Sequence, residues 1–272
     1  MSDPNPISGG APAGELRFHE LTSRIFSNTR QLRVWLPPGY TSAANEGRRY
    51  PVFYLNDGQN LFEAATSFAG VHWHVGESLS RLIAEKLVPP MLAVGIDNAT
   101  VERIREFLPY KSLYPPVPRP LGKHYPDFLL REVMPFIERT YRVARGVKNT
   151  GLGGSSLGAL ISLHTVIARP GVFGRLLLES ASLFVSNRQL LKDSRANANW
   201  PQRIFLGIGT QESRQKDRDQ RIVDDVRALA HTLHLAGLRE KRLRVSIQEG
   251  ATHCEAAWAE RFPEAVSFLF GG

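Results

Sequence analysis

The chain has 272 residues, of which 42% are hydrophobic and 22% are charged, which excludes a disordered chain, a collagen-like fibre and a membrane-embedded bundle. Lys and Arg number 34 against 26 Asp and Glu, giving a formal net charge of +8. The basic residues are interspersed with acidic ones and do not alternate with aromatic residues, so we expect a solvated surface and no nucleic-acid partner.

The start of the chain is polar and rich in Pro, Gly and Ser. It lacks the basic start and apolar stretch of a signal peptide, and no segment has the roughly 18 consecutive apolar residues of a membrane helix. We therefore predict a flexible tail over residues 1–14, a single domain over residues 15–272, a cytoplasmic location and no membrane partner. The single cysteine, Cys254, excludes an intramolecular disulfide.

The rest of the chain alternates predicted strands with predicted helices. Alternating apolar and polar side chains predict two neighbouring antiparallel strands over residues 15–26 and 31–36. Short β-prone runs, typical of parallel strands covered on both faces, occupy residues 52–55, 91–96, 176–178, 204–208 and 243–247. Apolar residues at helical spacing occupy residues 75–87, 128–141, 157–168, 222–235 and 256–270. This pattern predicts an α/β fold with a mostly parallel central sheet, helices on both faces, and ligands at the carboxyl ends of the strands.

One segment fits neither a helix nor a central strand. Residues 109–120 contain too many prolines for either, so we predict a long loop. Such a loop is either a surface connector or a wall over a pocket, and Tyr110 is a candidate pocket residue in the second case.

A nucleophile motif precedes the helix predicted over residues 157–168. Gly154-x-Ser156-x-Gly158 matches the Gly-x-Ser-x-Gly elbow, in which a strand reverses sharply into a helix and exposes the serine hydroxyl. No Gly-Lys-Ser/Thr follows, which argues against a Walker phosphate loop. A glycine-rich turn with no catalytic role is the alternative.

A serine nucleophile needs a general base, which follows the serine along the chain in this kind of fold. His253 comes directly after the last predicted strand, where a strand end would deliver a base. His231 and His234 lie inside a predicted helix, where packing is the expected role. His253 is therefore the predicted base.

The base in turn needs an orienting acid, which comes between the serine and the histidine in chain order. Glu212 stands in the loop beyond the strand predicted over residues 204–208, and we select it. Asp217 and Asp219 are competing carboxylates, and an exposed loop glutamate is the alternative.

Acyl transfer also requires an oxyanion hole. An Asp57-Gly58 turn follows the strand predicted over residues 52–55, and the next residue, Gln59, is the candidate for one backbone N–H donor. Leu157, after the nucleophile, would supply the other. An ordinary Asp-Gly turn is the alternative.

At this point the chain resembles the putative-esterase family of α/β-hydrolases, which includes siderophore, feruloyl and acetyl-xylan esterases, S-formylglutathione hydrolase and the mycolyltransferases. The resemblance runs from about Leu32 to the C-terminus and rests on residues 36–40, 57–62, 94–98, 135–137 with 141–142, 154–158 and 253–258. It implies a triad of Ser156, Glu212 and His253, with the N–H groups of Gln59 and Leu157 as the oxyanion hole and no cofactor. The acid is Glu where many members have Asp.

Two further residues are weaker pocket candidates. Trp73 would line an acyl or aromatic pocket, although a core role fits it equally well. Arg105 would contact an anionic group of the substrate, although a surface ion pair is favoured. We predict no metal at His72 and His74, because no nearby carboxylate or cysteine completes a ligand set.

The sequence thus predicts a serine carboxylic-ester hydrolase that forms an acyl-enzyme with a small-molecule ester. Short-acyl, aryl or feruloyl-type and siderophore esters are the expected substrates. The alternatives are acyl transfer to an alcohol or sugar, and an inactive hydrolase fold used for binding. The sequence does not indicate an oligomeric state.

Overall fold

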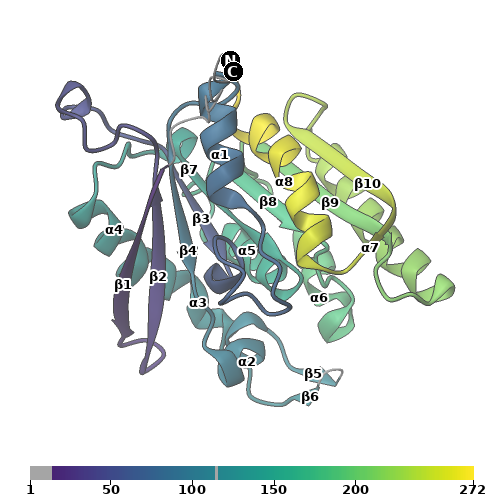
Figure 1. Cartoon of the computed structure of the whole chain (residues 1–272). Helices are drawn as coiled ribbons and strands as arrows, with labels where there is room; N and C mark the ends of the chain where they lie inside the picture. The colour runs from purple at the N-terminus through teal and green to yellow at the C-terminus, as the bar shows by residue number, and fades with distance from the viewer. Residues whose placement is uncertain (1–13, 114–115) are drawn as a thin grey trace, which may run out of the picture.

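The computed structural model describes residues 14–113 and 116–272, so residues 1–13 of the predicted tail lie outside the described part. An eight-stranded sheet crosses the molecule in the order β1-β2-β4-β3-β7-β8-β9-β10 (Figure 1). Its strands are β1 (Glu15–Ser23), β2 (Asn28–Leu36), β3 (Val52–Asn56), β4 (Leu92–Ile96), β7 (Thr150–Ser155), β8 (Arg175–Glu179), β9 (Arg203–Gln211) and β10 (Leu243–Thr252).

Most of this sheet is parallel. Strand β1 pairs antiparallel with β2, and β2 pairs antiparallel with β4, whereas the pairs from β4 through β3, β7, β8 and β9 to β10 are parallel. The carboxyl ends of β3, β7, β9 and β10 therefore point to the same edge, where α/β folds bind their ligands. The predicted α/β fold is confirmed.

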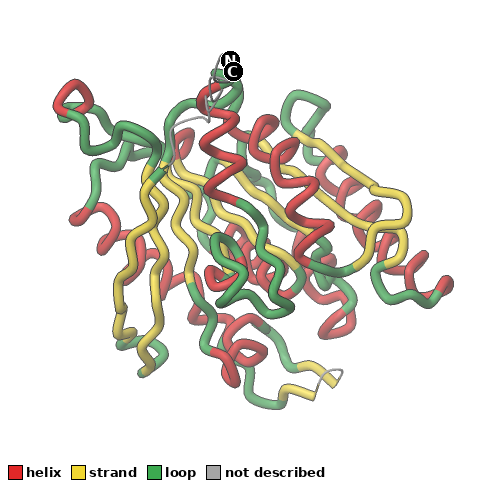
Figure 2. Tube along the Cα trace, viewed as in Figure 1, coloured by secondary structure: helices red, strands yellow, loops and turns green. Residues whose placement is uncertain are grey.

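Helices cover both faces of the sheet, as the red tubes on either side of the yellow strands show (Figure 2). They are α1 (Val75–Ala84), α2 (Arg103–Phe107), α3 (Tyr125–Phe128), α4 (Met134–Thr140), α5 (Leu157–Ala168), α6 (Val185–Ser194), α7 (Lys216–Leu235) and α8 (Glu255–Phe270). Helices α1 and α8 pack together on one face, and α5 and α7 lie on the opposite face. Among the described helices, none combines the length and the apolarity needed to cross a bilayer.

Some elements differ from the sequence-based expectation. Helices α2 and α6 were not predicted, because they are short or have few apolar residues at helical spacing. The proline-rich segment contains two paired two-residue strands, β5 (Ser112–Leu113) and β6 (Pro116–Val117), so it is not entirely loop. Its residues 114–115 lie outside the described part.

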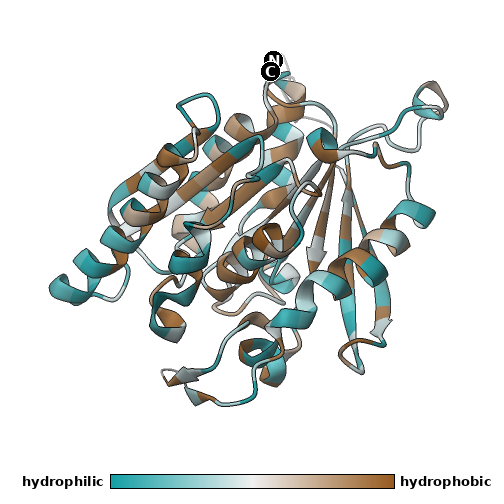
Figure 3. Cartoon of the chain, turned by 180° about the vertical axis from the view of Figure 1, so that it is seen from behind, coloured by the Kyte–Doolittle hydropathy of each residue, from teal (hydrophilic) through white to brown (hydrophobic). Residues whose placement is uncertain are grey.

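The core forms on both sides of the sheet. One cluster of buried apolar residues joins the sheet to α5 and α7, and a second joins it to α1 and α8. The central strands are predominantly hydrophobic (Figure 3), and α5 is buried around most of its circumference. Burial on both faces explains why these strands are continuous apolar runs instead of alternating ones. The sheet is therefore a rigid support for the loops at its carboxyl edge.

Candidate active site

Ser156 lies in a sharp turn between β7 and α5. Its φ of 56° and ψ of −121° are strained for a residue with a side chain. The turn is held because the Ser156 N–H donates to the carbonyl oxygen of Glu179 at 2.8 Å. The strand, turn and helix expected at the motif are present, and they direct Ser156 to the carboxyl edge of the sheet.

The glycines of the motif allow the turn to pack closely. A Cβ at Gly154 would lie 3.1 Å from the Cβ of Asn56 and 3.1 Å from the carbonyl carbon of Gly158. These approaches leave little space for any side chain. Glycine is therefore the residue that fits where β7 turns into α5 beside β3.

The predicted acid and base are in direct contact. Nδ1 of His253 lies 2.5 Å from Oε2 of Glu212. Glu212 follows β9, its side chain is only 1% exposed, and His253 follows β10. The competing carboxylate Asp219 instead accepts hydrogen bonds from the N–H and hydroxyl of Ser213. Glu212 is therefore the carboxylate that orients His253, with Nδ1–H donating to it.

The second oxygen of Glu212 is also engaged. Oε1 accepts hydrogen bonds from the Ser180 hydroxyl at 2.7 Å and from the Gly209 N–H at 2.7 Å. Burial raises the pKa of Glu212, but the hydrogen bonds from His253, Ser180 and Gly209 outweigh this effect and place that pKa below its ordinary value. The carboxylate is thus held in its charged form.

Trp258, the first large aromatic residue of α8, contacts His253 directly and is linked to Glu212 through Ser180. Its indole N–H donates to the Ser180 hydroxyl at 2.9 Å, and its ring meets the His253 ring edge to face, with centroids 5.0 Å apart. This ring contact holds the imidazole from one side. Trp258 also lines the cavity described below.

The candidate oxyanion turn follows β3 as a short 3-10 helix, Gly58–Asn60. Asp57 enters it with a left-handed φ of 58° and accepts hydrogen bonds from Arg103 at 2.6 and 2.8 Å and from Asn98 at 2.7 Å. Within the described part of the chain, the backbone N–H groups of Gln59 and Leu157 have no hydrogen-bond acceptor. Two free donors of this kind are what an oxyanion hole requires.

Ser156, His253 and Gln59 line one cavity of about 910 Å³ at the carboxyl edge of the sheet. The hydroxyl of Ser156 lies 3.2 Å from that of Ser182, and no hydrogen bond joins Ser156 to His253 in the part of the chain that the structure describes. Catalytic hydrogen bonds are often long or misaligned before substrate binds. A rotation of the Ser156 side chain about χ1 would redirect its hydroxyl away from Ser182.

The other predicted pocket residues do not line this cavity. Trp73 is 2% exposed and packs against Trp258 and Phe262, because it belongs to the core beneath α1 and α8. Arg105 pairs with Glu102 on the surface at 2.5 Å. Neither residue lines the cavity: Trp73 has the core role that fitted it equally well, and Arg105 forms the surface ion pair that was favoured.

Tyr110 is also outside the cavity lining. Its hydroxyl donates to Asp193 of α6, and its backbone oxygen accepts a hydrogen bond from Ser186. Burial and the neighbouring Asp193 carboxylate raise the pKa of Tyr110. These contacts attach the start of the proline-rich segment to α6 and away from Ser156.

Sequence reasoning missed three residues that the fold brings to the site. Ser180 and Ser182 follow the carboxyl end of β8, where a run of polar residues after an apolar strand was an available signal. Arg103 lines the cavity two residues before Arg105, the residue that was predicted to do so. Which of these two arginines faces the cavity depends on the first turn of α2, a short helix that was not predicted.

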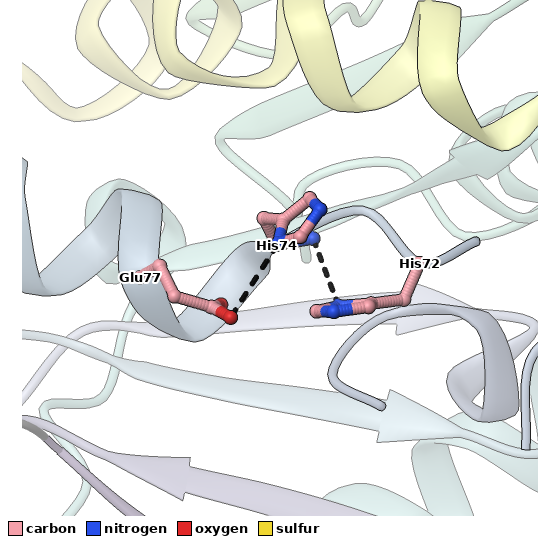
Figure 4. A group of neighbouring side chains, drawn as sticks. All are labelled: His72, His74 and Glu77. Carbon is pink, nitrogen blue, oxygen red and sulfur yellow. Dashed lines mark hydrogen bonds and ion pairs between the residues drawn. The ribbon is translucent and has the colours of Figure 1, made fainter. Parts of the chain in front are cut away.

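The reasoning against a metal site at His72 and His74 was wrong on one point. Glu77 supplies a nearby carboxylate, with Oε1 3.4 Å from Nδ1 of His74 (Figure 4). The first turn of α1 brings this residue, three positions after His74, back over the histidine.

Known proteins resemble this chain over most of its length. The protein YbbA of Bacillus subtilis (strain 168) is 26% identical over 263 residues, which cover 95% of this chain and 97% of the relative. YjcH of the same organism is 23% identical over 212 residues, which cover 78% of this chain and 79% of the relative.

Solved structures share the fold. The enterobactin esterase FES from Shigella flexneri superposes with a TM-score of 0.73 at 21% identity, covering 97% of this chain and 62% of that one. A ferulic acid esterase superposes with a TM-score of 0.68 at 16% identity, covering 95% of this chain and 98% of that one. A family model described as "Putative esterase" matches residues 23–269. The chain therefore belongs to the putative-esterase family of α/β-fold hydrolases.

Proposed function

We propose that the protein is a serine carboxylic-ester hydrolase that works through an acyl-enzyme on Ser156. The observation that carries this proposal is the 2.5 Å contact between His253 and the buried Glu212, beside a cavity that also contains the strained Ser156. An inactive binding protein would have no use for a strained serine and a histidine oriented by a buried carboxylate at the same strand ends.

In the first half of the reaction, Nε2 of His253 takes the hydroxyl proton of Ser156 as Oγ attacks the ester carbonyl carbon. The carbonyl oxygen becomes an oxyanion and accepts hydrogen bonds from the N–H groups of Gln59 and Leu157. The C–O bond to the leaving alcohol then breaks, the alkoxide takes the proton from His253, and the acyl group stays on Ser156.

In the second half, His253 takes a proton from water, and the hydroxide attacks the acyl carbon. The bond to Ser156 breaks, the serine oxygen recovers its proton from His253, and the carboxylic acid leaves. Glu212 keeps the imidazole in one tautomer and stabilises its cation in both halves. The lowered pKa of Glu212 supports this role, because the carboxylate must remain charged.

The cavity supports a bulky, uncharged ester as the substrate. Phe68 and Val101, which are 83% and 89% exposed, line it together with Ile104, so its outer wall is apolar. Its two arginines are already paired, Arg33 with Asp97 and Arg103 with Asp57. Aryl or feruloyl-type and siderophore esters fit these walls, and the names of the two similar structures lend support.

The test is hydrolysis of p-nitrophenyl acetate, a feruloyl ester and a trilactone siderophore by the protein and by Ser156→Ala. We expect the substitution to lower kcat by at least about 10⁴-fold, because loss of a catalytic serine removes the covalent route. A fluorophosphonate probe should label the unsubstituted protein once and the variant not at all.

Ser246→Ala is the matched control, since Ser246 lies on β10, does not line the cavity, and its hydroxyl donates to Glu264. It should retain activity and labelling. Substantial ester turnover by a correctly folded Ser156→Ala protein would refute the mechanism.

A further inference from the structure

Two histidines and a glutamate converge outside the cavity that contains Ser156. His72 and His74 precede α1, and Glu77 lies in its first turn; the three side chains face one another (Figure 4). One ligand atom from each residue lies within 4.8 Å of the other two. Among the described residues, no other group of His, Cys, Asp and Glu meets this condition.

Backbone hydrogen bonds on both sides of His74 fix the segment that contains the two histidines. Trp73 between them is buried, its N–H donates to the carbonyl oxygen of Asn60 at 3.0 Å, and the N–H of Val75 donates to that of Leu61 at 3.1 Å. His74 itself has a left-handed φ of 52°, which turns its ring toward that of His72, with the ring centroids 3.9 Å apart. The His74 N–H donates to Nδ1 of His72 at 3.2 Å (Figure 4), so Nε2 of His72 is the ring nitrogen left for a cation.

The distance between His74 and Glu77 suits a small tetrahedral cation. Zn²⁺ binds imidazole nitrogen and carboxylate oxygen at about 2.0–2.2 Å, so neighbouring ligands in a tetrahedron are about 3.4 Å apart. Nδ1 of His74 and Oε1 of Glu77 are 3.4 Å apart. Two imidazoles with one carboxylate favour zinc and similar transition metals over Mg²⁺ or Ca²⁺, which prefer sites made of oxygen ligands alone.

We propose that His72, His74 and Glu77 bind a divalent transition-metal cation such as Zn²⁺, with water at the open coordination position. The site is reachable, because the His74 and Glu77 side chains are 55% and 62% exposed. The nearest basic residue on the helix, Arg81, pairs with Glu85 and leaves Glu77 to the histidines.

The cation joins the loop before α1 to the first turn of that helix. This loop begins at the candidate oxyanion turn and contributes Thr66 and Phe68 to the cavity lining. The ligands themselves do not line the cavity. The metal is therefore a clamp on a wall of the cavity and takes no part in the chemistry at Ser156.

The test is calorimetric titration of the untagged protein with Zn²⁺, together with the visible absorption of the Co²⁺ form, whose intensity reports tetrahedral coordination. We expect one site per chain and an unfolding midpoint that rises by several degrees when the metal is well above its dissociation constant. The variants are His72→Ala, Glu77→Gln and His74→Asn, the last chosen because asparagine tolerates a left-handed backbone.

Each variant should weaken Zn²⁺ binding by at least about tenfold, since even the outer-shell partners of metal ligands are worth about 10–100-fold in affinity. His231→Ala, which removes an exposed histidine of α7, should bind Zn²⁺ as the unsubstituted protein does. Absence of binding by the unsubstituted protein, or equal affinity in the three variants, would overturn the proposal. Because the readout is metal binding, it is independent of whether the esterase mechanism holds.

Discussion

Ser180 connects the residues that support the proposed base. Its hydroxyl donates to Glu212 and accepts from the Trp258 indole, so it has one partner in each direction. Trp258 in turn lies against His253. This arrangement fixes the position of the Glu212 carboxylate from the side opposite His253, and it makes Ser180 a positioning residue.

Ser180→Ala should therefore lower kcat by about tenfold, with little change in KM, because a hydrogen bond to a charged group is worth roughly 1.5–3 kcal/mol. Loss of this donor also raises the pKa of Glu212, so the acid limb of the pH profile of kcat should move to higher pH. Steady-state kinetics between pH 4 and 8 measure both effects. Ser80→Ala, a buried serine of α1, is the control, and an unaltered pH profile in Ser180→Ala would contradict the assigned role.

Strand β7 ends directly before Ser156, the proposed nucleophile, and half of its residues are glycine. Gly153 faces Leu177 of β8 in register, and a Cβ at Gly153 would lie 2.6 Å from the Leu177 Cβ and 3.0 Å from its carbonyl oxygen. The strand can therefore approach β8 closely only without a side chain here. Close packing along β7 is what places Ser156 beside the ends of β3 and β8.

Gly153→Ala should destabilise the protein by about 1–3 kcal/mol, the usual range for overpacking a buried site. Urea unfolding followed by circular dichroism gives the change in free energy. Gly47→Ala is the matched control, because a Cβ at Gly47 has no heavy atom within 4 Å. If Gly153→Ala had the same free energy of unfolding as Gly47→Ala, β7 and β8 could move apart without cost, and the close-packing argument would be wrong.

At the scale of the whole molecule, a buried ion pair lies under the site. Glu179 is fully buried, and its Oε2 accepts a hydrogen bond from Nε of Arg261 at 2.9 Å and lies 2.7 Å from Nη2 of the same guanidinium. Its Oε1 has no hydrogen-bond partner among the described residues. Burial, together with the charges of Glu212 and Glu264, raises the pKa of Glu179 to about 7 despite the attraction of Arg261. The folded protein therefore holds this proton more tightly than the unfolded chain does.

The stability of the protein should consequently fall as pH rises from about 4.5 to about 7, because in this window the unfolded chain releases the Glu179 proton first. The contribution is on the order of 3 kcal/mol. Glu212 acts in the opposite sense, and its contribution is lost as pH falls below its ordinary value of 4.5. Urea unfolding at pH 5 and pH 8 measures the difference.

Glu179→Gln resembles the protonated acid and should lose less stability than the unsubstituted protein between pH 5 and pH 8. Glu240→Gln, at an exposed position, should follow the unsubstituted protein. If Glu179→Gln lost as much stability as the control across this interval, Glu179 would be ionised in the folded state throughout, and the pKa assignment would be wrong.

The alternation of strands and helices, the Ser156 elbow, and the order of the proposed serine, acid and base along the chain could all be predicted from the amino-acid sequence. These features are local, because burial of a strand on both faces, a turn that needs glycine, and a polar residue after an apolar run each leave a pattern within a few positions. Strand β7 escaped recognition as a β-prone run because its glycines lack the side chains on which that pattern depends.

The residues that surround the proposed serine, acid and base could be identified only from the tertiary structure. Ser180 meets Glu212, and Trp258 meets Ser180, because the carboxyl ends of β8 and β9 and the start of α8 lie side by side although they are distant in sequence. Trp73 lies in the core and Arg103 lines the cavity because the packing of the neighbouring helices fixes the direction of each side chain. The spacing of residues in the sequence does not encode that packing. Long-range contacts fix these directions, whereas the contact of Glu77 with His74 is local and follows from the first turn of α1.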